Sequence, residues 1–340
     1  MSNKVYQLVT DRMVELLEAG TIPWRKTWKA SEMPRSLSTG KPYQGVNVFM
    51  LWGTAMVKGY GSEYWGTYKA IQDRGGQVRK GEKSTLVVFW KFIEVEDKKT
   101  GEEKKIPMLR YFSVFNADQC DGLELPVTGN DAAADPIAAA EALFEGMPQR
   151  PEVKFGGNRA YYSPGLDYVG LPLRTSFESA ESFYTTAFHE LVHATGHESR
   201  LDRNLNGSFG NHEYSKEELV AEMGAAFLCA LSGIERKTED NSAAYLAHWI
   251  KALQGDPKLI VTAAGAAQKA ADFISRNGAN APSGNPTEEE SHDQRRDYLR
   301  RRGFLRPRAF TGERSSRKSH SPGRQPGSTA LSLRTEHAHP

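Results

Sequence analysis

The chain has 340 residues, of which 39% are hydrophobic and 25% charged, and its net charge is +2; these are the proportions of a globular protein with room for two domains. No apolar run approaches the roughly 18 residues that a membrane-spanning helix needs, and the N-terminus lacks the apolar core of a secretory signal. The two cysteines, Cys120 and Cys229, are far apart, which favours a reducing compartment over a disulfide framework. These features predict a cytoplasmic protein without a membrane partner.

The charge is distributed unevenly along the chain. Residues 1–83 carry 13 Lys and Arg against 7 Asp and Glu, and residues 276–340 carry the same numbers, so the middle of the chain is net acidic. A basic front end on a nearly neutral chain favours a polyanionic partner for that end.

The front of the chain alternates between helical and strand-like patterns. Helices are predicted over residues 4–20, 46–58 and 68–76, and strands over 84–96 and 106–117. A polar stretch over 97–104 separates the two strands and indicates a hairpin. The pattern therefore predicts an α+β domain over residues 1–125.

Basic and aromatic residues are interleaved in this front domain. Single-stranded nucleic acid is bound by this combination, because cations pair with phosphates while aromatic faces stack on unpaired bases. The residues expected to contact single-stranded DNA are Trp24, Arg25, Lys26, Trp28, Lys41, Tyr43, Asn47, Tyr68, Arg79, Lys80 and Lys83. The alternative is that the aromatic residues belong to the core and the lysines to a solvated face, because no compact nucleic-acid-binding motif is present.

The rest of the chain divides into three parts. Residues 126–151 are rich in Ala, Pro and Gly and predict a linker with one short helix. A second domain is expected over residues 152–275, with a capping box at Thr175 and Glu178 opening its first helix. Its strands are predicted over 153–157, 159–163 and 167–172, and its helices over 176–195, 216–232 and, as a pair, within 241–275. Residues 276–340 are rich in Arg, Ser, Pro and Gly and predict a disordered basic tail.

The string H-E-x-x-H occurs near the end of the helix predicted over 176–195. His189 and His193 are four residues apart, so their side chains lie about 40° apart on one helix face and can bind one ion. Glu190 projects beside that ion, where its carboxylate can take a proton from metal-bound water. A catalytic zinc takes three protein ligands and keeps a fourth position open, so one more ligand is expected downstream.

The loop after this helix contains three candidates for the missing ligand. His197 follows too closely, because Gly196 is expected to end the helix and a continued helix would carry His197 a full turn past the metal. Asp202 and His212 lie in a polar loop and stay open as ligands.

The following helix contains the preferred third ligand. Glu218 and Glu222 are also four residues apart, so one can bind the metal while the other orients a ligand histidine. We expect Glu218 to be the ligand and Glu222 to be its alternative or the orienting partner. If Ser215 and Glu218 instead form a capping box, Glu222 becomes the ligand.

Two ordered sets of motifs carry a resemblance to a known family. The first set is 21-TIPWRKTW-28, 40-GKPYQGVNVFML-51, 68-YKAIQDRGGQVRKGEKSTLVVFW-90 and 111-YFSVFNADQC-120. The second set is 161-YYSPGLDYVGLP-172, 188-FHELVHATGHESRLDR-203, 214-YSKEELVAEMGAAFLC-229 and 241-NSAAYLAHWIKAL-253. On these motifs, over about residues 3–275, the chain resembles the ArdC-type antirestriction proteins of conjugative plasmids and related mobile elements.

The resemblance implies a single-stranded-DNA-binding N-terminal domain joined to a zincin-like, gluzincin-type metallopeptidase domain. Such proteins are associated with protecting incoming plasmid DNA from host restriction during conjugation. By position, the resemblance implies His189, His193 and Glu218 as ligands of zinc, with manganese as the alternative ion, and Glu190 as the general base. The tail from residue 276 departs from the family and is assigned no function.

The expected function is therefore antirestriction by a DNA-binding protein with a zinc-dependent peptidase site. Its expected partners are single-stranded DNA and a peptide or protein substrate. We expect the strand over 167–172 to offer an edge to an extended peptide, and Tyr161 or Tyr162 to stabilise the oxyanion. Two alternatives stay open: a protein that protects DNA by occupancy and has a non-proteolytic metal site, or a general cytoplasmic zinc protease.

Overall fold

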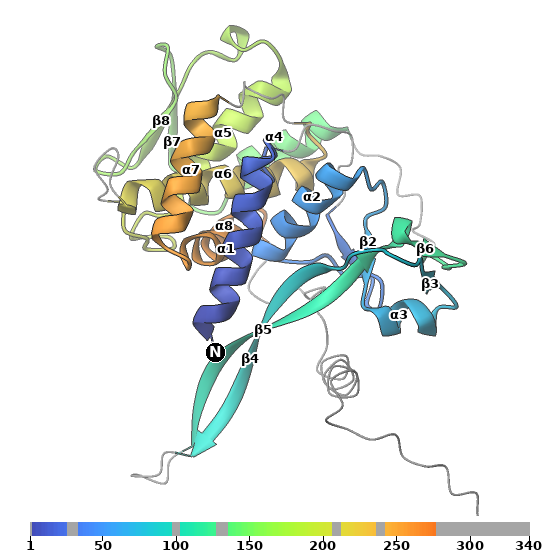
Figure 1. The fold of residues 1–340 in the computed structure, drawn as a ribbon. Coiled ribbons are helices and arrows are strands. Elements are labelled where there is room, and N and C mark those ends of the chain that lie inside the picture. Colours follow the sequence, from blue (N-terminus) through green and yellow to red (C-terminus); the bar gives the residue numbers. More distant parts are fainter. Residues whose placement is uncertain are drawn as a thin grey trace, which may run out of the picture. The chain divides into compact units, whose positions relative to one another are not determined.

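A computed structural model describes residues 2–25, 33–96, 103–126, 135–205, 212–235 and 242–276 (Figure 1). The predicted basic tail over 276–340 lies outside the described residues, except for its first residue. The expected mixture of helices and strands is confirmed. Among the described residues, no helix combines the length and apolar character that crossing a membrane requires.

The described part of the front half contains three helices and six strands. The helices are α1 (Ser2–Glu18), α2 (Val46–Lys58) and α3 (Tyr68–Asp73). The strands are β1 (Arg35–Ser36), β2 (Tyr64–Gly66), β3 (Gln77–Val78), β4 (Thr85–Glu96), β5 (Glu103–Asn116) and β6 (Cys120–Asp121). A 3₁₀ turn, η1 (Ala117–Gln119), follows β5. The three predicted helices and the two predicted strands of this half are all present.

The strands of the front half form two small sheets. One has the order β1-β2-β5-β4, and the other pairs β3 with β6. β4 and β5 are antiparallel throughout, with Thr85 opposite Val114 and Glu96 opposite Glu103, and they form the long twisted ribbon in Figure 1. The hairpin predicted from the polar stretch is therefore correct, while the connection over 97–102 lies outside the described residues.

Helix α2 is buried on nearly all sides, which explains its apolar sequence. Every residue from Val46 to Ala55 is buried. Gly53 allows a close approach to the first helix, because a Cβ at this position would lie 2.6 Å from Leu16 Cδ1 and 2.9 Å from Pro23 Cγ. Gly59 ends the helix in the left-handed conformation, where a glycine has no steric cost.

The back half consists of helices around a small sheet. The strands are β7 (Glu152–Phe155), β8 (Tyr161–Ser163) and β9 (Tyr168–Leu171), followed by the 3₁₀ turn η2 (Arg174–Ser176). The helices are α4 (Pro136–Gly146), α5 (Ala180–Ala194), α6 (His212–Ser232), α7 (Ala243–Gly255) and α8 (Leu259–Ile274). β9 lies in the centre of the sheet, parallel to β7 and antiparallel to β8. The expectation that 167–172 offers a free edge is therefore wrong, because both edges of β9 are paired.

Two predicted helix starts are also wrong. α5 begins after Ser179, whose side chain accepts a hydrogen bond from the Ser182 backbone N–H, and not at the capping box proposed for Thr175. α6 begins at His212, so Ser215 lies inside the helix and does not cap it. This start of α6 excludes the alternative in which Ser215 and Glu218 form a capping box.

A single cluster of buried apolar side chains joins the two halves. It extends from Val5 on α1 to Ile274 on α8 and includes residues from α2, α5 and α6. α4 lies within the stretch predicted as a linker, and its Phe144 is 1% exposed within the same cluster. The predicted boundaries at 125, 151 and 152 stay predictions, but the described residues on both sides of them share one core.

Candidate metal centre

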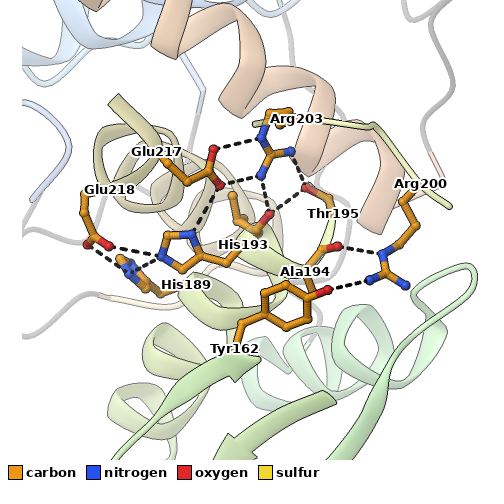
Figure 2. Close-up of polar contacts among 10 residues, drawn as sticks. Tyr162, His189, His193, Ala194, Thr195, Arg200, Arg203, Glu217 and Glu218 are labelled. Atoms are coloured by element: carbon orange, nitrogen blue, oxygen red, sulfur yellow. Dashed lines mark hydrogen bonds and ion pairs between the residues drawn. The ribbon is translucent and has the colours of Figure 1, made fainter. Parts of the chain in front are cut away.

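Helix α5 presents two imidazole rings from successive turns. His189 Nε2 and His193 Nε2 lie 3.2 Å apart, with the ring centroids 4.8 Å apart (Figure 2). The opposite face of the same helix packs Phe188, Leu191 and Val192 into the core, where each is 0% exposed. Burial of this apolar face therefore orients both rings toward the neighbouring helix α6.

Helix α6 contributes a carboxylate to the two rings. Glu218 Oε2 lies 3.7 Å from His189 Nε2, and Glu218 Oε1 lies 3.5 Å from His193 Nε2. The three side chains form the one group among the described residues whose His, Cys or carboxylate atoms are placed to hold a metal ion, with all ligand atoms within 4.8 Å of one another. Two imidazoles and one carboxylate are the donor set of several catalytic zinc sites, so these residues fit a divalent ion.

The electrostatics of the cluster favour charged donors. Burial opposes ionisation of Glu218, but hydrogen bonds from His189 and His193 outweigh it and hold the pKa of this carboxyl well below its usual range. Burial likewise opposes a charged His193, but the carboxylates of Glu217 and Glu218 raise the pKa of its imidazole to about 10. The carboxylates of Glu217 and Glu218 therefore favour a positive charge in this region of the cluster.

Glu190 lies next to His189 on α5 but does not belong to the three-residue cluster. Its side chain is buried, with 8% exposure, and this burial raises its pKa. Electrostatic interactions with the two histidines and a hydrogen bond from the backbone of Tyr162 act in the opposite direction and lower this pKa. Tyr162 is on β8, so this contact places the carboxylate of the H-E-x-x-H string beside the edge of the small sheet.

Glu217 and Arg203 complete the surroundings of His193 and were not anticipated from the sequence. Glu217 Oε1 lies 3.2 Å from His193 Nδ1, and Arg203 donates to both oxygens of Glu217 at 2.7 and 3.1 Å (Figure 2). Glu217 directly precedes Glu218, so the two adjacent glutamates in the sequence were the one pattern that could have indicated a second carboxylate near the metal site. No local pattern pointed to Arg203, which comes from the loop after α5.

The other predicted ligands lie elsewhere. Glu222 Oε1 lies 3.3 Å from Arg25 Nη2 and 3.4 Å from the Tyr245 hydroxyl, so it neither joins the cluster nor contacts a ligand histidine. Its expected role as alternative ligand or orienting partner is wrong, because the next turn of α6 directs it to Arg25. His197 Nδ1 lies 2.8 Å from Ser199 Oγ, and neither His197 nor Asp202 belongs to the cluster.

The predicted DNA contacts separate into three groups. Trp24, Tyr43 and Asn47 are at most 1% exposed, so no base can stack on them or pair with them, and this prediction is wrong for all three. Arg25 pairs with Glu222 and stacks over the Tyr245 ring at 3.9 Å, and its expected phosphate contact stays a prediction. Of the remaining predicted contacts, Tyr68 is half-buried, and the exposed ones are Lys41, Arg79, Lys80 and Lys83. Lys26 and Trp28 lie outside the described residues.

Two family models match the chain in order. The N-terminal domain of anti-restriction factor ArdC matches residues 3–115, and a zincin-like metallopeptidase matches residues 138–266. The uncharacterized protein y4eC of Sinorhizobium fredii (strain NBRC 101917 / NGR234) is 35% identical over 288 residues, which are 82% of this chain and 93% of y4eC. DNA primase TraC of Escherichia coli is 39% identical over 292 residues, which are 79% of this chain but 27% of the primase.

Two solved structures are also similar. The metal-free crystal structure of the antirestriction ArdC protein from the R388 plasmid is 46% identical, with a TM-score of 0.66 over 82% of this chain and 98% of that one. The Mn(II)-bound structure of the same protein is 44% identical, with a TM-score of 0.65 over 82% of this chain and 99% of that one. The protein therefore belongs to the ArdC antirestriction family, in which an ArdC N-terminal domain is followed by a zincin-like domain that implies a metal.

Proposed function

We propose that this protein protects incoming plasmid DNA from host restriction by combining single-stranded-DNA binding with a metal-dependent peptidase site. The observation that carries the proposal is the convergence of His189, His193 and Glu218, with Glu190 beside them. The corresponding location is the cytoplasm, where incoming DNA meets restriction enzymes. Zinc is the ion that this donor set favours, and manganese is the alternative because the R388 ArdC protein has a Mn(II)-bound structure.

The chemistry we propose is hydrolysis of a peptide bond. A divalent ion held by His189, His193 and Glu218 would polarise a water molecule and the scissile carbonyl. Glu190 takes the proton from the attacking water and delivers it to the leaving amine. Its burial supports this role, because a desolvated carboxylate binds a proton more readily than an exposed one.

The edge strand β8 is the proposed track for the peptide. Among the described strands β8 pairs with β9 alone, and its Tyr162 backbone contacts Glu190. An extended peptide that adds to β8 would therefore lie next to the metal cluster. The Tyr162 hydroxyl donates to Asp167 at 2.8 Å and accepts from Arg200, so it supports β8 and does not face an oxyanion.

The DNA-binding part of the proposal now rests on fewer residues. Lys41, Lys80 and Lys83 are exposed on the front half and carry no carboxylate partner among the described residues. Arg79 is exposed as well but is bound to Glu82 and Asp121 at 3.3 and 3.5 Å. The similarity of 79% of this chain to part of DNA primase TraC supports a nucleic-acid role for the protein.

Replacement of Glu190 by Gln tests the proposal. In a transfer assay with a restricting recipient, we expect the Glu190→Gln protein to bind its metal and to lose protection. Full protection by this variant would favour the first alternative, a protein that shields DNA by occupancy. Binding to labelled single-stranded DNA should weaken steeply with salt, since lysine–phosphate contacts release counterions. Salt-independent or absent binding would favour a general protease.

A further inference from the structure

We infer that Glu217, held in place by Arg203, is the positioning residue that directs the lone pair of His193 Nε2 to the metal. The inference rests on the proposed metal site and assigns to Glu217 the task that the sequence had predicted for Glu222.

The first step is the tautomer of His193. Its two ring nitrogens have different neighbours: Nδ1 lies 3.2 Å from Glu217 Oε1, while Nε2 lies 3.5 Å from Glu218 Oε1 and 3.2 Å from His189 Nε2. A carboxylate next to Nδ1 accepts a hydrogen bond from Nδ1–H. The neutral ring then carries its lone pair on Nε2, which faces the other two ligands.

The second step is the rigidity of Glu217. Arg203 donates from Nε to Glu217 Oε2 at 3.1 Å and from Nη2 to Glu217 Oε1 at 2.7 Å, a two-point contact that fixes the plane of the carboxylate. The exposed fractions of the two side chains are 14% for Arg203 and 12% for Glu217. Water therefore competes little for these contacts.

The third step is the anchoring of Arg203 to the ligand helix. Its guanidinium also donates to the Thr195 hydroxyl at 2.7 Å (Figure 2). It donates to the Val192 carbonyl at 2.7 Å as well, and the Arg203 backbone N–H donates to the Gly196 carbonyl at 2.9 Å. These acceptors lie at the C-terminal end of α5, which bears His193. Arg203 thus connects the end of α5 to the carboxylate of α6 and sets their relative position at the metal.

The fourth step is charge balance. Glu190, Glu217 and Glu218 bring three carboxylates to one partly buried region, where like charges repel strongly. Arg203 neutralises the carboxylate of Glu217, which leaves Glu218 as the anionic donor to the ion. The arrangement uses Glu217 as a hydrogen-bond acceptor and does not make it a fourth ligand.

The test compares metal affinity in Glu217→Ala, Glu217→Gln and Glu222→Gln. Zn(II) is titrated into each metal-stripped protein in competition with a chelating dye. We expect about ten- to a hundredfold weaker binding in Glu217→Ala. Glu217→Gln should recover part of this loss, because its amide oxygen still accepts from Nδ1–H. Glu222→Gln is the matched control on the same helix and should bind Zn(II) as the wild type does.

A spectroscopic measurement separates positioning from general damage to the fold. In the Zn(II)-loaded wild type, proton–nitrogen correlation NMR should show a hydrogen-bonded Nδ1–H on His193, and the Glu217→Ala protein should lose this signal or shift it. Wild-type affinity and an unchanged His193 signal in Glu217→Ala would overturn the inference. Equal weakening in Glu222→Gln and Glu217→Ala would also overturn it. If the wild-type protein binds no Zn(II), this result would instead contradict the proposed metal site itself.

Discussion

Neighbouring glutamates on α6 have different surroundings because a helix turns about 100° per residue. Glu218 faces Nε2 of both histidines, whereas Glu217 faces Nδ1 of His193 and the guanidinium of Arg203. The following Glu222 lies one turn further on and pairs with Arg25. Three carboxylates within six residues therefore serve three separate purposes in the structure.

Glu190→Gln should separate metal binding from hydrolysis in the purified protein. The amide cannot take a proton from water, so we expect peptide hydrolysis to fall by about 10²- to 10⁴-fold. Zn(II) affinity should remain close to that of the wild type, because Glu190 is not among the three clustered donors. Hydrolysis of a peptide library by both proteins, with metal content measured in parallel, checks this; equal rates would contradict the role of Glu190.

Asp167→Asn should change how stability depends on pH. Hydrogen bonds from Arg200 and Tyr162 hold the pKa of Asp167 below its ordinary value of 3.8. Because the folded pKa is depressed, this stabilisation is fully present above the unfolded pKa and is lost as the pH falls through the folded one. We expect the variant to lose about 1–3 kcal/mol of unfolding free energy at pH 7. Asn tolerates the positive φ of 45° at this position.

Denaturant unfolding at pH 7 and at pH 3 measures the effect of Asp167→Asn. The difference between the wild type and the variant should be smaller at pH 3 than at pH 7. A difference that stays constant between the two pH values would contradict the assignment of this carboxylate as a charged partner of Arg200.

At the residue scale, sequence reasoning succeeded where contacts follow from spacing within one helix. The four-residue separation of His189 and His193 was enough to predict that they lie side by side. The roles of Glu217 and Glu222 were not predictable in this way, because they depend on Arg203 and Arg25, which reach α6 from other parts of the chain. Long-range partners of a charged side chain leave no periodic signal in the sequence.

At the scale of elements, the metal cluster depends on the close packing of α5 against α6. Gly224 lies at this contact: a Cβ there would meet Val192 Cγ2 at 2.7 Å and Cγ1 at 2.8 Å. Val192 is 0% exposed, so its side chain is enclosed by the core. The absence of a side chain at Gly224 therefore sets the distance between the helix that bears the histidines and the helix that bears Glu218.

Gly224→Ala should separate the two helices and weaken metal binding. Overpacking of this kind costs about 1–3 kcal/mol of unfolding free energy, and the displaced α6 should carry Glu218 away from the histidines. Gly265→Ala on α8 is the matched control, because a Cβ there meets nothing within 4 Å and alanine favours a helix. Thermal unfolding and Zn(II) titration check both variants; unchanged stability and affinity in Gly224→Ala would contradict this packing argument.

The sheet of the back half shows what strand patterns alone do not predict. The strand over 167–172 was recognised from its sequence, and β9 indeed occupies Tyr168–Leu171. Its assignment as an edge failed because the order of strands depends on pairing with β7 and β8, each a separate segment. An apolar strand such as β9, with Val169 and Leu171 both 0% exposed, is better placed in the centre of a sheet.

At the scale of the whole molecule, the interleaved aromatic and basic residues of the front half have a second explanation. Trp24 packs edge-on against Trp249 of α7 with centroids 6.0 Å apart, and its Nε1 lies 3.3 Å from the Tyr245 hydroxyl. Composition could not separate this core role from a base-stacking role, because aromatic residues serve both. The alternative stated for the tryptophans is correct for Trp24.

The shared core predicts that residues 2–276 unfold as one cooperative unit. A front half released from α6, α7 and α8 would expose apolar side chains of α1 and α2 that are buried in the common cluster. We expect tryptophan fluorescence and far-ultraviolet circular dichroism to report the same thermal transition. Two separated transitions would contradict it.

Arg25→Met should lower the midpoint of this shared transition. The variant leaves Glu222 without its guanidinium partner in a site where both side chains are 13% exposed. We expect a cost of about 3 kcal/mol, because the nearly buried carboxylate of Glu222 loses the cation that lies against it. Arg12→Met provides the control, since the exposed Arg12–Glu15 pair should contribute little. Equal midpoints for the two variants would show that the Arg25–Glu222 contact does not stabilise the joined halves.

Equilibrium titration of the metal-stripped protein with Zn(II) and Mn(II) tests the central claim most directly. The account predicts one ion per chain in the wild type, and strongly weakened binding in His189→Ala, His193→Ala and Glu218→Ala. A wild type that binds no ion, or a Glu218→Ala protein that binds it as tightly as the wild type, would contradict the account.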